Sequence, residues 1–211
     1  MKTRGAGGWR YKVTGRKNSK DHILDVVEQL CAEVGPYRLR HAQVARHLGI
    51  KPPSLYAHFP SMNDMLAAAT RRALEAIRAT YEELGESISP AAALDRSQAR
   101  QVDLLVARPG IARLVLFDLS QPGGAETVAW DMPEIEQITA CEEALFDRAV
   151  AAGQIPAQDF PIWFSTRMGA LYVGLSYEWL RPEPKDPSRI MMLKKSLQLT
   201  KCSRSFAPDM S

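Results

Sequence analysis

The chain has 211 residues, of which 45% are apolar and 24% charged, enough to bury the core of one domain or two small ones. No apolar run approaches the roughly 18 residues of a membrane span, and the first 20 residues lack the apolar stretch of a secretory signal, so a cytoplasmic protein is expected. The net charge is +3, but the charges are unevenly distributed, because residues 1–66 carry 11 Lys and Arg against 5 Asp and Glu. Such a basic segment is typical of a DNA-reading domain, although a solvated basic face would have the same composition.

The first 34 residues predict an arm followed by a helix. Residues 1–19 are basic and glycine-rich without a periodic apolar face, so a disordered arm is predicted. Such an arm can follow DNA phosphates, although a solubilising tail would have the same composition. Ser19 is a suitable N-cap for a helix over 20–34, which Gly35 and Pro36 end. Its apolar stripe, at helical spacing, comprises Ile23, Val26, Val27, Leu30 and Cys31.

The segment around Gly49 predicts a helix-turn-helix, the arrangement by which small proteins place one helix in the DNA major groove. Two short helices, over 40–48 and 52–58, flank Gly49, which supplies a turn where a positive φ is cheap. Leu55 and Phe59 lie four residues apart and face the core. The outward residues of the second helix are then Ser54, Tyr56, Ala57 and His58, with Lys51 at its entry.

The rest of the chain also predicts helices. Ser61 and Asp64 form a capping-box arrangement at the start of a longer helix that reaches about Leu84. No alternating strand pattern appears, so the fold is predicted to be all-α, with a three-helix helix-turn-helix domain over 20–77 and a second helical domain over 78–211. Breakers containing Gly and Pro separate the later helices, which are predicted over 90–108, 110–119, 133–152, 159–180 and 187–202.

Residues 20 to about 77 resemble the DNA-binding domain of the TetR family of transcriptional regulators. The matching residues, at matching spacing, are Val44, Ala45, Leu48, Gly49, Ile50, Ser54, Leu55, Tyr56, Ala57, His58, Phe59, Ser61 and Leu66. The resemblance implies that the second short helix is the recognition helix and that the remaining helices form a ligand-binding and dimerisation domain. It also implies a two-fold homodimer on double-stranded DNA with a palindromic operator.

The resemblance assigns DNA contacts to individual positions. Base edges would be reached from the start and outer face of the recognition helix, whereas Tyr56 and His58 would bind phosphates. Structural alternatives are that Tyr56 packs against the first helix and that His58 caps the recognition helix. Arg40, Lys51 and Met62 depart from the family's usual residues, which alters individual phosphate contacts more than the fold. The predicted DNA-binding residues are Arg40, Lys51, Pro53, Ser54, Tyr56, Ala57 and His58.

Aromatic and polar side chains in the second domain indicate an effector site. A pocket lined by such residues between helices is a usual small-molecule site, although an ordinary core has the same composition. The predicted ligand-binding residues are Phe117, Trp130, Gln137, Trp163, Arg167 and Tyr172. The helices over 159–180 and 187–202 have broad apolar surfaces, and in TetR-like proteins the two C-terminal helices pair with their copies in the dimer.

The function predicted from these features is a ligand-responsive transcriptional repressor that binds an unidentified small-molecule effector. The alternatives are a transcriptional activator and an interaction or ligand-binding protein with a weakened DNA-binding domain. An enzyme is not expected, because the sequence lacks a nucleophile elbow, a phosphate-cradling glycine loop and a dinucleotide-binding fingerprint. Metal-ligand spacing is lacking too, so no catalytic residue, metal or other cofactor is predicted.

Overall fold

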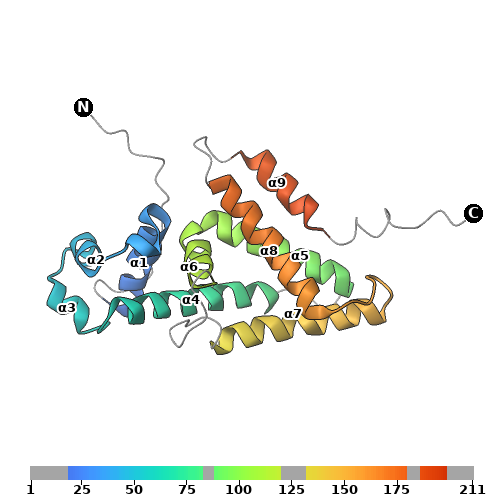
Figure 1. Ribbon diagram of the computed structural model, residues 1–211, viewed down its shortest axis with the longest axis horizontal. Coiled ribbons are helices and arrows are strands. Elements are labelled where there is room, and N and C mark those ends of the chain that lie inside the picture. Colours follow the sequence, from blue (N-terminus) through green and yellow to red (C-terminus); the bar gives the residue numbers. More distant parts are fainter. Residues whose placement is uncertain (1–18, 83–87, 120–131, 180–185, 199–211) are drawn as a thin grey trace, which may run out of the picture.

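A computed structural model describes residues 19–82, 88–119, 132–179 and 186–198, which form helices and their connections without a strand (Figure 1). The all-α prediction is confirmed. No described helix is long and apolar enough to cross a lipid bilayer. The elements are α1 (Lys20–Val34), the 3-10 turn η1 (Pro36–Arg38), α2 (His41–Leu48), α3 (Pro52–Tyr56), α4 (Met62–Glu82), α5 (Pro90–Ala107), α6 (Pro109–Leu119), α7 (Pro133–Ala151), α8 (Phe160–Trp179) and α9 (Pro187–Ser196).

The helix ends follow the predicted caps closely. The Ser19 hydroxyl accepts from the His22 amide at 3.2 Å, and α1 ends at Gly35, which has φ 81°. The turn between α2 and α3 is made by Gly49 at φ 68° and ψ 29°, a left-handed conformation that costs other residues roughly 1 kcal/mol or more.

Apart from shifts of one or two residues at other helix ends, three features differ from the prediction. The turn η1 was not predicted, and its N1 proline, Pro36, suits the start of a helical turn. Helix α3 ends at Tyr56 instead of His58, because the His58 amide bonds back to the Leu55 carbonyl at 3.0 Å and tightens the last turn. Helix α9 ends at Ser196, and the rest of the helix predicted to 202 lies partly outside the described residues.

Helices α1–α3 and the first half of α4, to Thr70, enclose one apolar core, and we call this part the head. Its largest fully buried side chains include Ile23, Leu55 and Met65. Leu114, which belongs to α6, lies in the same core and is also buried. The head core is therefore completed by a side chain from a later helix.

The second half of α4, from Ala73, packs with α5–α9 in a part that we call the body. Ala73, Leu74 and Ile77 of α4 share a core with apolar residues of α5, α6, α7 and α8. A smaller cluster of Phe146, Phe160 and Trp163 lies where α7 and α8 meet. In Figure 1, α4 runs as one continuous helix from the head to a place beneath α6 and above α7. The two cores consequently meet within α4 and not at a flexible linker.

Two cysteines of the described chain differ in accessibility, which provides a test of the α1 packing. Cys31 is fully buried, and burial raises the pKa of its thiol to about 12, whereas Cys141 on α7 is exposed. At pH 8 the Cys31 sulfur is therefore covered and protonated. In a Cys202→Ser variant, Ellman's reagent should label only Cys141 in the native protein and both cysteines after unfolding. Native labelling of Cys31 at that pH would contradict the packing.

Candidate functional site

The outer face of α3 is the most exposed helix face of the head. Leu55 is fully buried and Phe59, just beyond the helix, is nearly so, whereas Ser54, Tyr56 and Ala57 are exposed. Pro52 and Pro53 occupy the first turn, where their missing amide protons cost no helical hydrogen bond. Lys51 precedes them in an extended conformation and is exposed. The predicted inward and outward residues are thus placed as expected, except that His58 lies beyond the end of α3 and is half-buried.

Tyr56 is held by a contact that the sequence analysis did not anticipate. Its ring stacks on the imidazole of His41, the first residue of α2, with centroids 4.6 Å apart and planes 23° from parallel. The side chain of Tyr56 remains 49% exposed, so the phenol is both supported and accessible. The sequence offered no direct signal for this stack, which depends on the crossing of α2 and α3.

Arg40, His58 and Met62 surround this face in different ways. Arg40 is the N-cap of α2 without a side-chain cap, and its guanidinium donates to the carbonyls of Tyr37 at 3.0 Å and Leu39 at 2.9 Å. It is exposed, so its charge is held beside the start of α2. His58 is half-buried directly after α3, and Met62 is half-buried in the first turn of α4.

The start of α4 carries the predicted capping box. The Ser61 hydroxyl oxygen accepts from the Asp64 amide at 3.0 Å, and the Asp64 carboxylate accepts from the Ser61 amide at 3.0 Å.

The remaining exposed charges of the head are mostly positive, which suits a polyanion. The exposed basic side chains are those of Lys20, Arg38, Arg40, Arg46 and Lys51.

The body contains a buried ion pair between α7 and α8. Arg167 donates through Nε to the Glu142 carboxylate at 3.1 Å, and both side chains are almost fully buried. The same guanidinium donates to the Leu94 carbonyl of α5, donates to the Leu197 carbonyl after α9 at 3.4 Å, and lies 5.3 Å from the Trp163 ring centroid. One side chain therefore connects four helices and an aromatic ring.

Further buried polar groups extend this ion pair into a layer. Gln101 donates to the Tyr81 hydroxyl at 2.8 Å, and Gln98 donates weakly to the backbone carbonyl of Arg167 at 3.5 Å. Burial raises the pKa of Glu142, and Arg167 opposes that shift. Burial, together with the nearby Glu142, also raises the pKa of Tyr81. The side-chain oxygens of Gln98 and Gln101 are buried without a hydrogen-bond partner among the described residues, which is costly unless a ligand or water binds there.

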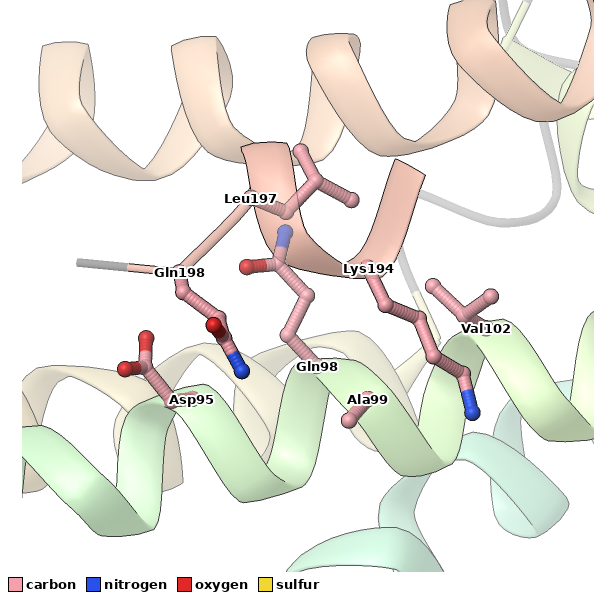
Figure 2. Close-up of a pocket in the computed structure, with 7 residues that line it drawn as sticks. All are labelled: Asp95, Gln98, Ala99, Val102, Lys194, Leu197 and Gln198. Carbon is pink, nitrogen blue, oxygen red and sulfur yellow. The ribbon is translucent and has the colours of Figure 1, made fainter. Parts of the chain in front are cut away.

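A shallow crevice with no room for a water molecule lies between α5 and α9, next to this layer. Figure 2 shows the Gln98 amide reaching up from α5 under Leu197, with Asp95 and Gln198 at one end of the crevice. Lys194 of α9 forms an ion pair with Asp103 of α5. The crevice is smaller than a typical ligand pocket, so an effector would have to separate these helices.

The predicted ligand-binding residues are only partly brought together. Trp163 and Arg167 are buried and in contact, whereas Tyr172 is buried in the larger body core, where burial raises its pKa. Gln137 is exposed on α7, away from the buried layer. The Phe117 side chain and all of Trp130 lie outside the described residues.

Glu142 is the main polar residue of the body that the sequence analysis missed. A usable signal existed, because Glu142 stands four residues after Ile138 and four before Phe146, in the buried stripe of α7. Its neighbour Glu143 is exposed, so composition alone did not separate the two acids.

Helices α8 and α9 both expose apolar and small residues. On α8, Ile162 and Val173 are 67% and 68% exposed, and Gly169 and Ala170 lie exposed between them. The two helices approach closely, since a Cβ on Gly174 would lie 2.7 Å from a methyl carbon of Leu193. The exposed apolar residues of α9 are Met191 and Met192.

The buried ion pair makes a testable contribution to pH-dependent stability. Without Arg167, the Glu142 pKa should rise further above its ordinary value of 4.5, so that the native state holds a proton that the unfolded state releases. In an Arg167→Met variant, the free energy of unfolding should therefore fall as pH rises from 5 to 8, by up to about 1.4 kcal/mol per unit within the window between the two pKa values.

Denaturant unfolding at four pH values measures this slope. Arg148→Met, at an exposed position of α7, is the matched control and should behave as the wild type does. Adding Glu142→Gln to the Arg167→Met variant should remove the additional slope. An unchanged slope in Arg167→Met would show that the Glu142 carboxyl does not depend on Arg167.

Comparison with known proteins gives a family match for part of the head by sequence and a shared fold for most of the chain. Residues 23–69 match the family described as bacterial regulatory proteins, tetR family. No curated protein matched the sequence. A TetR family transcriptional regulator PfmR from Thermus thermophilus has a similar structure, with TM-score 0.69 and 20% identity over 84% of this chain and 96% of that chain.

Two further solved structures share the fold. The ketosteroid transcriptional regulator KstR2 of Mycobacterium tuberculosis aligns with TM-score 0.69 and 18% identity, over 91% of this chain and 98% of that chain. The transcriptional regulator FadR from Bacillus subtilis, solved in complex with stearoyl-CoA, aligns with TM-score 0.69 and 14% identity, over 84% of this chain and 97% of that chain. At these identities the alignments show a common fold.

Proposed function

We propose, from the premise that this chain belongs to the TetR family of bacterial regulatory proteins, that it is a ligand-responsive repressor which binds a palindromic operator as a homodimer. The observation that carries the proposal is the shape of α3. Its inner residue Leu55 is locked in the head core, while Ser54, Tyr56 and Ala57 are presented outward beside exposed cations.

In this proposal the DNA-contact residues divide into two kinds. Ser54 and Ala57, with Lys51 and Pro53 at the start of α3, lie nearest the base edges and carry sequence preference. Tyr56, Arg40 and His58 bind phosphates and set the register on the duplex. The stack on His41 supports this role for Tyr56, because a phenol with few free rotamers loses little entropy when it binds.

We place the effector site in the body at Arg167 and Trp163, next to the Gln98 and Gln101 oxygens, which have no hydrogen-bond partner among the described residues. An effector with an acidic or carbonyl group would compete with Glu142 for the guanidinium. Because the same guanidinium also donates to the Leu197 carbonyl, the exchange would loosen α9 against α5. The energy required is modest, since each ~1.4 kcal/mol of differential binding shifts a two-state balance tenfold.

The exposed apolar face of α8 and α9 is assigned to the homodimer. A second copy would bury Ile162, Val173, Met191 and Met192 in a four-helix arrangement, and Gly169 would permit close approach. In this proposal α4 is the lever between a DNA-binding and a regulatory domain, and their cores divide α4 between Ala69 and Ala73, a few residues before the predicted boundary at residue 77. An interaction protein with a weakened head is the second candidate, favoured by Met62 and Arg40, which depart from the family's usual residues at their positions.

In vitro selection from a random duplex pool near physiological salt is the decisive experiment. Enrichment of an inverted repeat with half-sites about one helical turn apart would support a dimeric operator-binding regulator. Weak, salt-sensitive binding without enrichment would favour the interaction protein instead. The selected operator can then be used to screen for small molecules that release the protein from this DNA.

Substitutions on α3 should separate affinity from sequence preference. Tyr56→Phe removes one charge-assisted hydrogen bond to phosphate. It should therefore weaken binding to all DNA sequences alike, by about tenfold per half-site. Ser54→Ala should instead change the preferred base in the selected half-site, while Glu143→Ala, at an exposed position of α7, serves as its control. The assignment is wrong if Tyr56→Phe alters base preference and leaves general affinity unchanged.

A charge on the exposed face of α8 should prevent dimerisation. Val173→Glu would bury a carboxylate in the proposed interface, and an unpaired buried charge costs several kcal/mol. Sedimentation equilibrium should then give a folded monomer. Ala144→Glu, at an exposed position of α7, is the matched control and should leave the dimer intact. A dimeric Val173→Glu variant would place the interface elsewhere.

A further inference from the structure

The head is attached to the body in two places. The first attachment is α4 itself, which contributes Met65 and Ala69 to the head core and Ala73 and Ile77 to the body core. The second is the contact of α1 with the corner where α5 ends and α6 begins. A single helix would leave the head free to tilt by bending, whereas two separated attachments fix its angle.

The second attachment is centred on a buried carboxylate of the head. Glu28 of α1 is 3% exposed and accepts from Arg108, the C-cap residue of α5, through Nε at 2.9 Å and through Nη2 at 2.6 Å. This is the bidentate geometry in which Arg–carboxylate pairs are strongest and most directional. Arg72 of α4 lies 3.5 Å from the same carboxylate and donates to Asp25 at 2.8 Å. The pair thus joins head, lever and body in one place.

The backbones of α1 and α6 are in direct contact at Gly110. A Cβ on Gly110 would lie 2.2 Å from the Glu28 carbonyl oxygen, so the first turn of α6 rests on the main chain of α1. One turn later, Arg113 donates to the Cys31 carbonyl at 3.4 Å and Leu114 enters the head core. We call Glu28, Arg108 and Gly110 the clamp.

A small rotation of the head at the clamp would displace α3 by a distance comparable to a base-pair step. The stretch of α4 from Met62 to Arg72 is about 15 Å long, at 1.5 Å rise per residue. A rotation of roughly 13° at Arg72 therefore moves the α3 end of the head by about 3.4 Å, which is one base-pair step. In a two-fold dimer each head moves in this way, so the head angle determines which separation of half-sites can be bound.

We propose that the clamp sets the operator spacer length that the protein accepts, and that it does so without touching DNA. The inference rests on the proposed function, because spacer length has meaning only for a dimer on an inverted repeat. Glu28, Arg108 and Gly110 are positioning residues in this role. They select the distance between half-sites, whereas α3 selects the sequence of each half-site.

The test uses the full-length dimer and a panel of duplexes that carry the selected half-sites at the selected spacer and at one and two base pairs more or fewer. The wild type should bind the selected spacer about tenfold more tightly than its neighbours, within the 5- to 150-fold range typical of coupling. Glu28→Gln and Arg108→Gln should each reduce that preference by about fivefold or more and leave half-site sequence preference unchanged. Gly110→Ala should shift the optimum to another spacer, because α6 must move off α1.

Arg78→Gln is the matched control, since Arg78 pairs with the exposed Glu82 on the same helix and does not join head to body. Its spacer preference should equal that of the wild type. An equal loss of affinity at every spacer in Glu28→Gln and Arg108→Gln would overturn the proposal and leave the clamp a purely structural contact.

Amide hydrogen exchange without DNA tests the clamp independently of the operator. Glu28→Gln should speed exchange in α1 and the first turn of α6 and leave α7 and α8 protected. If selection yields no operator but exchange changes in this way, the proposed repressor function is wrong, whereas the role of the clamp in fixing the head on the body is supported. Unchanged exchange in α1 and α6 would overturn the clamp even if an operator is found.

Discussion

Helix α4 imposes the constraint on which the arrangement of this protein depends, because one uninterrupted helix belongs to two cores. Its backbone hydrogen bonds run in a single ladder, so its two halves cannot rotate separately without breaking that ladder. Met65 is fixed by the head and Ile77 by the body. Repacking at one end is therefore transmitted as a tilt of the other, and the remaining contacts between head and body decide how much tilt is allowed.

Two buried carboxylates have similar roles, one at the junction of head and body and the other inside the body. Glu28 is paired with arginines from other helices at the junction of head and body, and Glu142 is paired with Arg167 inside the body. Burying such charges costs desolvation energy that the pairing only partly returns, so neither pair is expected to add much net stability. Their directional geometry instead permits few relative placements of the helices, which apolar packing alone would not distinguish.

The sequence predicted local features better than contacts between distant residues. Leu55, Phe59 and Gly49 were placed correctly because each depends on spacing or on backbone conformation within one turn. The stack of His41 on Tyr56 and the entry of Leu114 into the head core depend on how separate helices cross, which periodicity does not encode. The predicted effector residues show the same limit, since Trp163 and Arg167 meet in the structure while Gln137 faces outward.

The two prolines that open α3 have a kinetic consequence. A helix as short as Pro52–Tyr56 is unstable as an isolated peptide, yet here φ is fixed covalently at two successive positions and Leu55 anchors the turn from within. The free head therefore already holds the shape in which it would dock, and little chain ordering remains for the encounter. We expect association with a polyanionic duplex to be limited by diffusion and electrostatic steering, so that differences among target sequences appear mainly in dissociation rates.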